Sequence, residues 1–211
     1  MVRFPTMILG IHLASDPYSI GIITPDNRSI EVSVSPSIAF NENLIDEIDA
    51  VAGKINLNSK QVTAIGVTHG PGSYTGIRIG ITVAKTLAQV LNIPIYPIST
   101  LEAMMLGVRH IRGLYLPTLP ARKGEANAAL FACSNGQIKR LSEDFSWTTE
   151  RMHTMLGRIR GPITVLDASS QVSGLRLALW AKDKLASGEK GSYKAVRPVY
   201  SHEPNIGTRK E

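Results

Sequence analysis

Runs of isoleucine and valine separated by polar turns open this chain. They lie at residues 7–14, 18–24 and 29–35, and a Pro-Asp-Asn sequence stands between the second run and the third. Strand-forming residues bounded by turn residues predict three strands, which we expect to form an antiparallel meander. Residues 42–54 then show the helical period and predict an amphipathic helix. Its apolar side consists of Leu44, Ile45, Ile48, Val51 and Ala52.

Strands and helices alternate in the segments that follow. A strand at 64–67, a helix, a strand at 93–98 and a further helix succeed one another. We expect the side-chain oxygen of Thr75 to cap the first of these helices, and Ser99 with Glu102 predicts a capping box for the second. Three strands followed by helix, strand, helix, strand and helix is the element order of a ribonuclease H-like lobe.

The second half of the chain partly repeats this order. Its predicted strands are residues 114–119, 126–133, 137–141 and 163–166, and its predicted helices are residues 148–159 and 172–185. We therefore predict an α/β fold of two ribonuclease H-like lobes, which is the plan of the actin-like ATPase superfamily. We place the first lobe at residues 1–105, a more divergent and basic second lobe at 106–204, and a disordered tail at 205–211.

A glycine-rich run at residues 70–80, Gly-Pro-Gly-Ser-Tyr-Thr-Gly-Ile-Arg-Ile-Gly, opens the helix that extends to about residue 91. Small residues recur in this helix every four positions, and such a ridge lets another element approach closely. Two glycines within a helix cost about 0.5–1 kcal/mol each relative to alanine, so a close contact should compensate. The contact is either the core of the chain itself or a partner protein. The residues concerned are Gly76, Ile77, Gly80, Ile81, Ala84 and Ala88.

The start of the same helix is also a candidate anion site. Its backbone N–H groups could hold a phosphate, although the glycine spacing matches neither a P-loop nor a dinucleotide fingerprint. The residues of this candidate anion-binding loop are Gly70, Gly72, Ser73 and Thr75.

Composition favours a globular protein of the cytoplasm. The 211 residues are 43% hydrophobic, which suffices for a sizeable core, and no run reaches the ~18 apolar residues of a membrane span. The first fifteen residues lack the pattern of a secretory signal, and the one cysteine, Cys133, lies in apolar surroundings that predict a buried thiol.

The positive charge lies in the second half of the chain. Residues 1–105 carry six basic and eight acidic residues, and residues 106–211 carry seventeen and nine, so the balances are −2 and +8. A basic lobe is compatible with phosphate contacts to RNA, and the alternative is a solvated basic face. Arg122 and Lys123, in a predicted hairpin turn, are the candidate RNA contacts.

Residue patterns for catalysis are lacking. No two of the five histidines lie within four residues of each other, and Gly-x-Ser-x-Gly does not occur. We therefore predict no catalytic residue, no metal site and no cofactor. His12 follows the first strand where an actin-like enzyme needs a hard oxygen ligand for magnesium, and we interpret it as non-catalytic.

Several short motifs occur in the order found in one protein family. These are Ile8-Leu9-Gly10-Ile11, the glycine-rich run, Ile98-Ser99-Thr100-Leu101-Glu102-Ala103, Ala121-Arg122-Lys123-Gly124-Glu125 and Pro198-Val199-Tyr200. The chain thereby resembles the TsaB family, also called YeaZ, almost throughout residues 7–105 and at short landmarks beyond. It departs where His12-Leu13-Ala14-Ser15 replaces the family's Asp-Thr-Ala-Thr.

The resemblance implies a non-catalytic scaffold subunit of the bacterial complex that forms threonylcarbamoyladenosine in transfer RNA, at the adenosine beside the anticodon. It implies pairing with a TsaD-like transferase through the glycine-rich helix, a TsaE-like ATPase in the assembled complex, contact with tRNA through that complex, and a homodimer as a further form. Two alternatives stay open at this point. One is an actin-like enzyme that uses ATP or cleaves peptides, and the other is a stand-alone RNA-binding protein.

Overall fold

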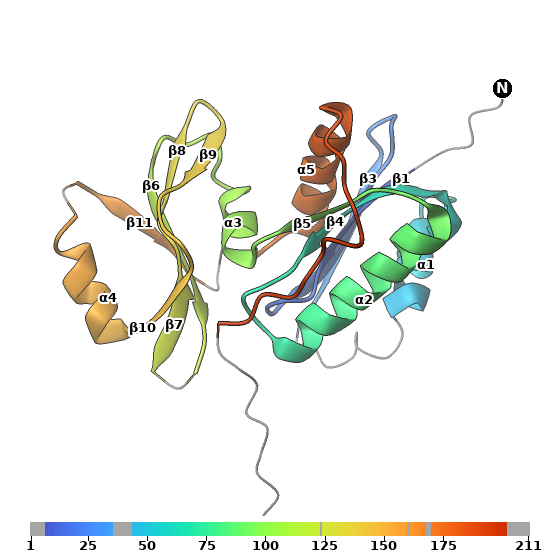
Figure 1. The fold of residues 1–211 in the computed structure, drawn as a ribbon. Coiled ribbons are helices and arrows are strands. Elements are labelled where there is room, and N and C mark those ends of the chain that lie inside the picture. Colours follow the sequence, from blue (N-terminus) through green and yellow to red (C-terminus); the bar gives the residue numbers. More distant parts are fainter. Residues whose placement is uncertain (1–6, 36–43, 123, 160, 168–169, 202–211) are drawn as a thin grey trace, which may run out of the picture.

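The computed structural model describes residues 7–35, 44–122, 124–159, 161–167 and 170–201, and it contains two β-sheets flanked by helices (Figure 1). The first sheet has five strands in the order β3-β2-β1-β4-β5. They are β1 (Met7–His12), β2 (Tyr18–Ile23), β3 (Ser29–Val34), β4 (Val62–Thr68) and β5 (Ile95–Ile98). β1, β2 and β3 form the predicted antiparallel meander, and β4 and β5 run parallel to β1.

Helices cover both faces of this sheet. α1 (Leu44–Gly53) and α2 (Tyr74–Leu91) lie on one face, and α5 (Gly174–Ala186) lies on the other. Because side chains alternate between the faces of a strand, Leu9 enters the core beneath α1 and α2, whereas Ile8 packs with residues of α5. Burial on both faces explains why β1 and β2 are buried along their whole length.

Three glycines at paired positions let α5 rest directly on the first sheet. Gly10 of β1 pairs with Gly21 of β2 and with Gly66 of β4. A Cβ atom on Gly10 would lie 1.9 Å from the carbonyl oxygen of Gly174, and one on Gly66 would lie 2.6 Å from that of Leu177. A side chain at either position would push the helix away from the sheet.

The second sheet is built around β6 (Gly113–Pro120). Its strand order is β10-β7-β6-β8-β9, and β11 pairs with β6 in parallel. The other strands are β7 (Glu125–Ala128), β8 (Phe131–Ser134), β9 (Gln137–Arg140), β10 (Phe145–Thr148) and β11 (Ile163–Leu166). α3 (Thr100–Met105) packs near β6, and α4 (Thr149–Leu156) lies beside β10.

The segment predicted as one strand at residues 126–133 forms two strands. β7 and β8 both pair with β6, but β7 continues to β10 and β8 continues to β9. At the break, the backbone N–H of Leu130 donates to Oγ of Ser142 at 2.8 Å. The strand divides because its two halves serve different neighbours. The sequence-based prediction does not include β10.

Two predicted helix caps differ in the structure. Ser73, not Thr75, caps α2, and its Oγ accepts a hydrogen bond from the N–H of Gly76 at 3.2 Å. The helix therefore begins two residues earlier than a cap at Thr75 predicts. Ser99 stands at the N-cap of α3, but its side chain makes no capping hydrogen bond. The predicted capping box between Ser99 and Glu102 is therefore wrong.

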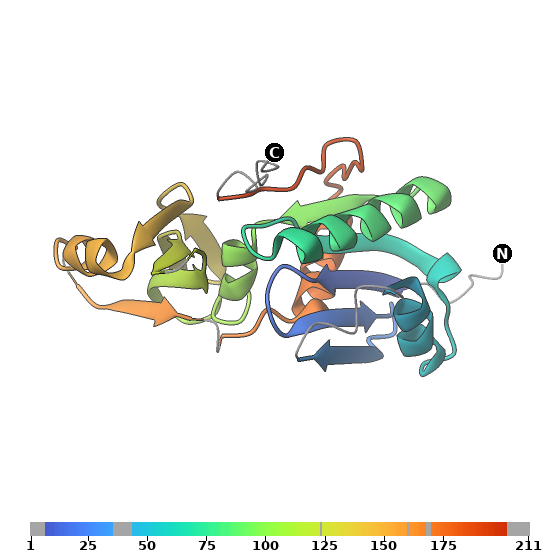
Figure 2. The ribbon, with the colours of Figure 1, turned by 90° about the horizontal axis from the view of Figure 1, so that it is seen from below.

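Packing crosses the predicted boundary between the lobes. α5 follows the second sheet in the sequence, yet it packs on β1, β2 and β4 of the first sheet. Leu177 of α5 also joins the core cluster that contains α3 and strands of the second sheet. The division at residues 105 and 106 stays a prediction, and the predicted tail at 205–211 lies outside the described residues. Figure 2 shows the last described segment running beside α2.

Candidate functional site

The inner face of α2 belongs to the core of its own chain. It contains Gly76, Ile77, Gly80, Ile81, Ala84 and Ala88, all buried in the isolated chain. A Cβ atom on Gly76 would lie 1.8 Å from the carbonyl oxygen of Leu13, and one on Gly80 would lie 3.6 Å from the Leu13 side chain. The structure corrects the expectation that these six residues contact a partner. A ridge of small residues accommodates the chain's own backbone as readily as another helix, and here it accommodates the segment after β1.

The outer face of α2 is open and forms a shallow cavity of about 360 Å³. The cavity is lined by Tyr74, Thr75, Arg78, Ile79, Thr82 and Val83. Ile79 and Val83, which are half-buried against the core of the chain, supply an apolar strip, and Val90, seven residues beyond Val83, is 75% exposed. An apolar strip on an exposed helix is a typical contact surface for another protein. We call the six lining residues the outer face of α2.

Aromatic and cationic groups frame the first turn of this outer face. The rings of Tyr74 and Tyr200 lie 4.9 Å apart between centroids. The guanidinium of Arg78 lies 5.2 Å from the centre of the Tyr74 ring and donates a hydrogen bond to its hydroxyl at 3.0 Å. Burial and the neighbouring Tyr74 raise the pKa of Tyr200, so its hydroxyl stays neutral at physiological pH. The cluster joins the last described segment of the chain to α2.

Gly70 and Gly72 shape the loop before α2. Their φ angles are 114° and 148°, a region that favours glycine. A Cβ atom on Gly70 would lie 2.0 Å from the carbonyl oxygen of Val199, and one on Gly72 would lie 2.0 Å from that of Ala14. Both glycines are therefore required where the loop packs between the last described segment and the segment after β1.

The candidate anion-binding loop already uses some of its donors within the chain. The N–H of Ser73 donates to the carbonyl of Ala14 at 2.6 Å, and the N–H of Gly76 donates to Ser73 Oγ. An anion would have to replace these hydrogen bonds. Anion binding at Gly70, Gly72, Ser73 and Thr75 stays a prediction.

The candidate RNA contacts lie at the turn between β6 and β7. Arg122 is exposed, and its carbonyl accepts a hydrogen bond from the N–H of Glu125 at 2.8 Å. Lys123 lies outside the described residues. The turn is the predicted charged hairpin, and its contact with RNA stays a prediction.

His12, at the end of β1, has both ring nitrogens engaged within the protein. Nδ1 lies 3.0 Å from Oγ1 of Thr68, and Nε2 lies 2.8 Å from Oγ of Ser15. Full burial lowers the pKa of His12 to about 3. The ring is therefore neutral at physiological pH, and the non-catalytic interpretation of His12 stays a prediction.

Sequence reasoning missed the outer face of α2, although a signal exists. Ile79 and Val83 are apolar residues four positions apart, and they lie off the core stripe that includes Ile77 and Ile81.

Within the described ranges, no group of three His, Cys, Asp or Glu side chains could hold a metal ion, and no helix is long and apolar enough to cross a membrane.

Comparison with known proteins points to one family. The model of a family described as "TsaD: tRNA N6-adenosine threonylcarbamoyltransferase" matches residues 34–193. The tRNA threonylcarbamoyladenosine biosynthesis protein TsaB of Bacillus subtilis (strain 168) is 31% identical over 137 residues, which are 65% of this chain and 60% of that protein. The tRNA N6-adenosine threonylcarbamoyltransferase of Rhodospirillum rubrum is 28% identical over 163 residues, covering 66% of this chain and 45% of that protein.

Solved structures share the whole fold. The structure titled "YeaZ from Pseudomonas aeruginosa" has a TM-score of 0.76 and 20% identity, and the match covers 92% of this chain and 99% of that chain. A second, titled as an uncharacterized protein with similarity to peptidase YeaZ from the same organism, has a TM-score of 0.78 and 19% identity, with 93% and 100% covered. This likeness confirms the predicted α/β fold of two ribonuclease H-like lobes.

Proposed function

The chain belongs to the TsaD family of tRNA N6-adenosine threonylcarbamoyltransferase proteins, and on that premise we propose that it is a partner subunit in the formation of threonylcarbamoyladenosine in tRNA. Its role is that of a TsaB-type scaffold, which pairs with a TsaD-like transferase and supports the transfer without performing the chemical step. The name of the Bacillus subtilis relative supports this pathway. The chain spans 60% of that relative and 45% of the Rhodospirillum rubrum transferase.

The observation that carries the proposal is the outer face of α2. It presents Ile79 and Val83 beside the Tyr74–Arg78 pair, and the inner face of the same helix is fixed to the first sheet. A surface built on a rigid helix can be matched by a partner without reordering the backbone. The chain therefore pairs with its partner through the outer face of α2, which lies opposite to the small-residue ridge on the inner face.

Further parts of the proposal follow from the same role. A TsaE-like ATPase joins the pair, tRNA is contacted through the assembled complex, and the chain self-associates through the outer face of α2 when the transferase is absent. The complex works in the cytoplasm, where tRNA is modified. His12 is a neutral imidazole where magnesium would need an oxygen ligand, which supports a non-catalytic role for this subunit.

Co-expression with the TsaD-family transferase of the same genome tests the proposal. We expect the tagged chain to retain the transferase through affinity and size-exclusion steps, and light scattering should give the mass of a one-to-one complex. The reconstituted pair, supplied with threonylcarbamoyl-adenylate and tRNA, should modify more tRNA than the transferase alone. A transferase that neither binds the chain nor gains activity from it would refute the scaffold role.

A further inference from the structure

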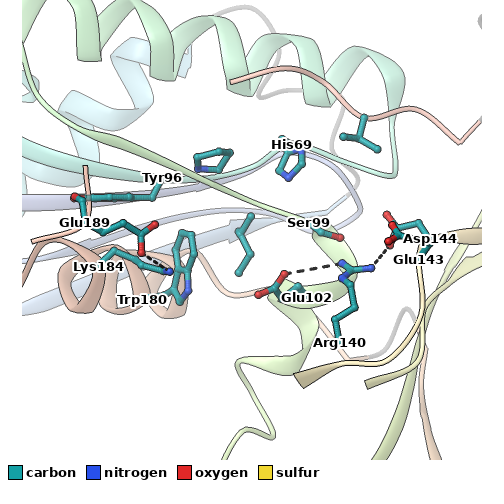
Figure 3. Close-up of a pocket in the computed structure, with 13 residues that line it drawn as sticks. His69, Tyr96, Ser99, Glu102, Arg140, Glu143, Asp144, Trp180, Lys184 and Glu189 are labelled. Atoms are coloured by element: carbon teal, nitrogen blue, oxygen red, sulfur yellow. Dashed lines mark hydrogen bonds and ion pairs between the residues drawn. The ribbon is translucent and has the colours of Figure 1, made fainter. Parts of the chain in front are cut away.

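A polar cavity of about 530 Å³ lies apart from the outer face of α2 (Figure 3). Its walls come from β5, the residue after β4, the start of α3, the end of β9 with the segment after it, α5, and the chain after α5. A volume of this size is typical of a pocket for a small molecule. Two side chains of its walls, Ser99 and His69, have a buried polar atom without a hydrogen-bond partner among the described residues.

Ser99 is the first such group. It occupies the N-cap of α3, where a serine hydroxyl normally accepts a hydrogen bond from the helix backbone, but it makes no such bond. The residue is 8% exposed, and its Oγ has no hydrogen-bond partner among the described residues. Figure 3 shows this hydroxyl in the cavity, between the ring of His69 and the guanidinium of Arg140. A buried hydroxyl without a partner is costly, so an occupant of the cavity should satisfy it.

His69 is the second group. Its Nδ1 atom is buried without a partner among the described residues. Burial lowers the pKa of His69, so the ring is neutral at physiological pH. A neutral histidine has one donor and one acceptor nitrogen. In the tautomer that carries its proton on Nε2, Nδ1 offers a lone pair to the cavity.

Charges on the walls favour a cation. The cavity is lined by two basic residues, Arg140 and Lys184, and four acidic residues, Glu102, Glu143, Asp144 and Glu189. Each basic group already has an acidic partner: Arg140 lies 2.5 Å from Asp144, and Lys184 lies 2.6 Å from Glu189. Each basic charge is thus balanced by a close acidic partner, and the lining has two more acidic than basic side chains.

Glu102 is the acidic group of the wall that comes from the same helix as Ser99. It lies one helical turn after Ser99 in α3, and its carboxylate is 4.0 Å from Arg140, a distance too long for a strong ion pair. Burial raises the pKa of Glu102, and Arg140 acts in the opposite direction. A buried carboxylate whose charge Arg140 balances only at a long distance would be stabilised further by a second cation. Tyr96 and Trp180, whose rings meet edge to face at 6.4 Å, form an aromatic wall beside it.

We propose that this cavity binds a small primary amine in its protonated form. An ammonium group has three N–H donors and no acceptor. Nδ1 of His69, Oγ of Ser99 and the carboxylate of Glu102 provide three acceptors, and the aromatic wall receives the hydrocarbon part of the ligand. This explains why Ser99 and Glu102 leave the capping box that their spacing predicts. The proposal does not depend on the partner role of α2.

Three probes of equal length test the proposal. The full chain, labelled with ¹⁵N, is titrated at neutral pH with butylamine, butanol and butyrate, and amide shifts are followed by NMR. We expect saturable shifts of Ser99 and Glu102 with butylamine, and binding at least about tenfold weaker with the neutral and anionic probes, because a hydrogen bond to a charged group is worth more than one to a neutral group. Equal binding of butanol, stronger binding of butyrate, or no binding of butylamine would overturn it.

Variants locate the ammonium group. Ser99→Ala and Glu102→Gln should each weaken butylamine binding by roughly tenfold or more, whereas Asp46→Asn, which removes an exposed carboxylate on α1, should leave it unchanged. Ser99→Ala removes no capping bond, so it should keep its thermal stability and remain a valid test. If both cavity variants bind butylamine as the parent does, the proposed acceptors are wrong.

The pH dependence gives an independent check. Binding should weaken as the pH falls through the raised pKa of Glu102, and protonation of His69 should also weaken it, because Nδ1 then ceases to accept. The other charged groups that face the cavity are Arg140, Glu143, Asp144, Lys184 and Glu189. In Glu102→Gln the step that belongs to Glu102 should be absent. Butylamine affinity that is constant across the acid range would contradict the proposed set of acceptors.

Discussion

The α-carbon of Gly76 faces the backbone carbonyl of Leu13 so closely that a Cβ atom there would lie 1.8 Å from its oxygen. Gly80, one turn further along α2, faces the side chain of Leu13 instead, at 3.6 Å from an added Cβ atom. The first distance is impossible without a shift of the backbone, and the second is an ordinary van der Waals contact. Two glycines of one sequence motif therefore have different physical roles.

Substitution of each glycine by alanine should give effects of opposite sign. Gly80→Ala should stabilise the chain by up to about 1 kcal/mol, because alanine favours the helix and the space accepts a methyl group. Gly76→Ala should destabilise it by about 1–3 kcal/mol or more, because α2 must move away from the segment after β1. Urea unfolding of both variants measures these free energies. Equal effects would show that α2 packs differently from the structure.

Pairing with the transferase should depend on the outer face of α2. Thr82→Arg places a bulky charge in the exposed cavity at no cost to the core, and we expect it to weaken pairing by about tenfold or more. Thr154→Arg, an identical change at an exposed position of α4, is the matched control. Light scattering of the mixed proteins measures the affinity. Normal pairing of the Thr82 variant would move the interface away from α2.

The sequence predicts the elements well because each element is encoded locally. The meander of β1, β2 and β3 follows from apolar runs and turns, and α1 follows from its helical period. The row of Gly10, Gly21 and Gly66 could not be predicted, because these residues are distant in the sequence and meet only through strand pairing. The close packing of α5 on the first sheet depends on these three glycines, so the sequence analysis does not predict it either.

Side-chain roles are harder to predict where a local rule and a tertiary contact compete. The ridge that includes Gly76 and Gly80 shows that something approaches α2 closely, but the pattern does not distinguish the chain's own backbone from a partner. Ser99 and Glu102 have the spacing of a capping box, yet both line a cavity that includes residues from α5 and from the segment after β9. Contacts of that range leave no periodic signal in a single sequence.

Burial of His12 should make the folded chain less stable in acid. The unfolded chain takes up a proton on this ring near pH 6.5, whereas the folded chain resists protonation until about pH 3. The unfolded state therefore binds more protons between these values, and stability is full above pH 6.5 and falls as the pH is lowered. The loss at pH 5 is about 2 kcal/mol from this residue. His69, whose pKa is also lowered, adds to the same trend.

Unfolding by urea at pH 8 and pH 5 checks this effect. In His12→Gln, which keeps polar atoms near Ser15 and Thr68 but cannot titrate, the difference between the two pH values should shrink by about the same 2 kcal/mol. A variant with the full pH dependence of the parent would show that another group causes it.

The isolated chain should neither hydrolyse ATP nor cleave peptides. The ring of His12 is engaged by Thr68 and Ser15, and a neutral imidazole is a poor substitute for the oxygen ligand that magnesium prefers. Phosphate release and cleavage of fluorogenic peptides should both stay at the level of the buffer. Turnover that disappears in His12→Gln or Asp16→Asn would restore the enzyme alternative and end the non-catalytic assignment.

The basic second half of the chain should contribute phosphate contacts when the complex holds tRNA. Phosphate contacts supply affinity without base specificity, and each phosphate neutralised steepens the logarithmic dependence of affinity on salt by about 0.7–0.9. Changing both Arg122 and Lys123 to alanine should therefore weaken binding of different tRNAs to a similar degree. The same change should make the salt dependence shallower by about 0.7–0.9 for each phosphate that the variant no longer neutralises.

Filter binding of the assembled complex across a series of salt concentrations measures both quantities. Lys139→Ala with Arg158→Ala, at other positions of the basic half, is the matched control for a general loss of charge. If the control lowers affinity and slope as much as the Arg122 and Lys123 changes do, the attraction is spread over the whole lobe. Unchanged affinity and slope in the Arg122 and Lys123 variant would mean that the hairpin between β6 and β7 is a solvated turn, because a cation that meets no phosphate releases no counterion.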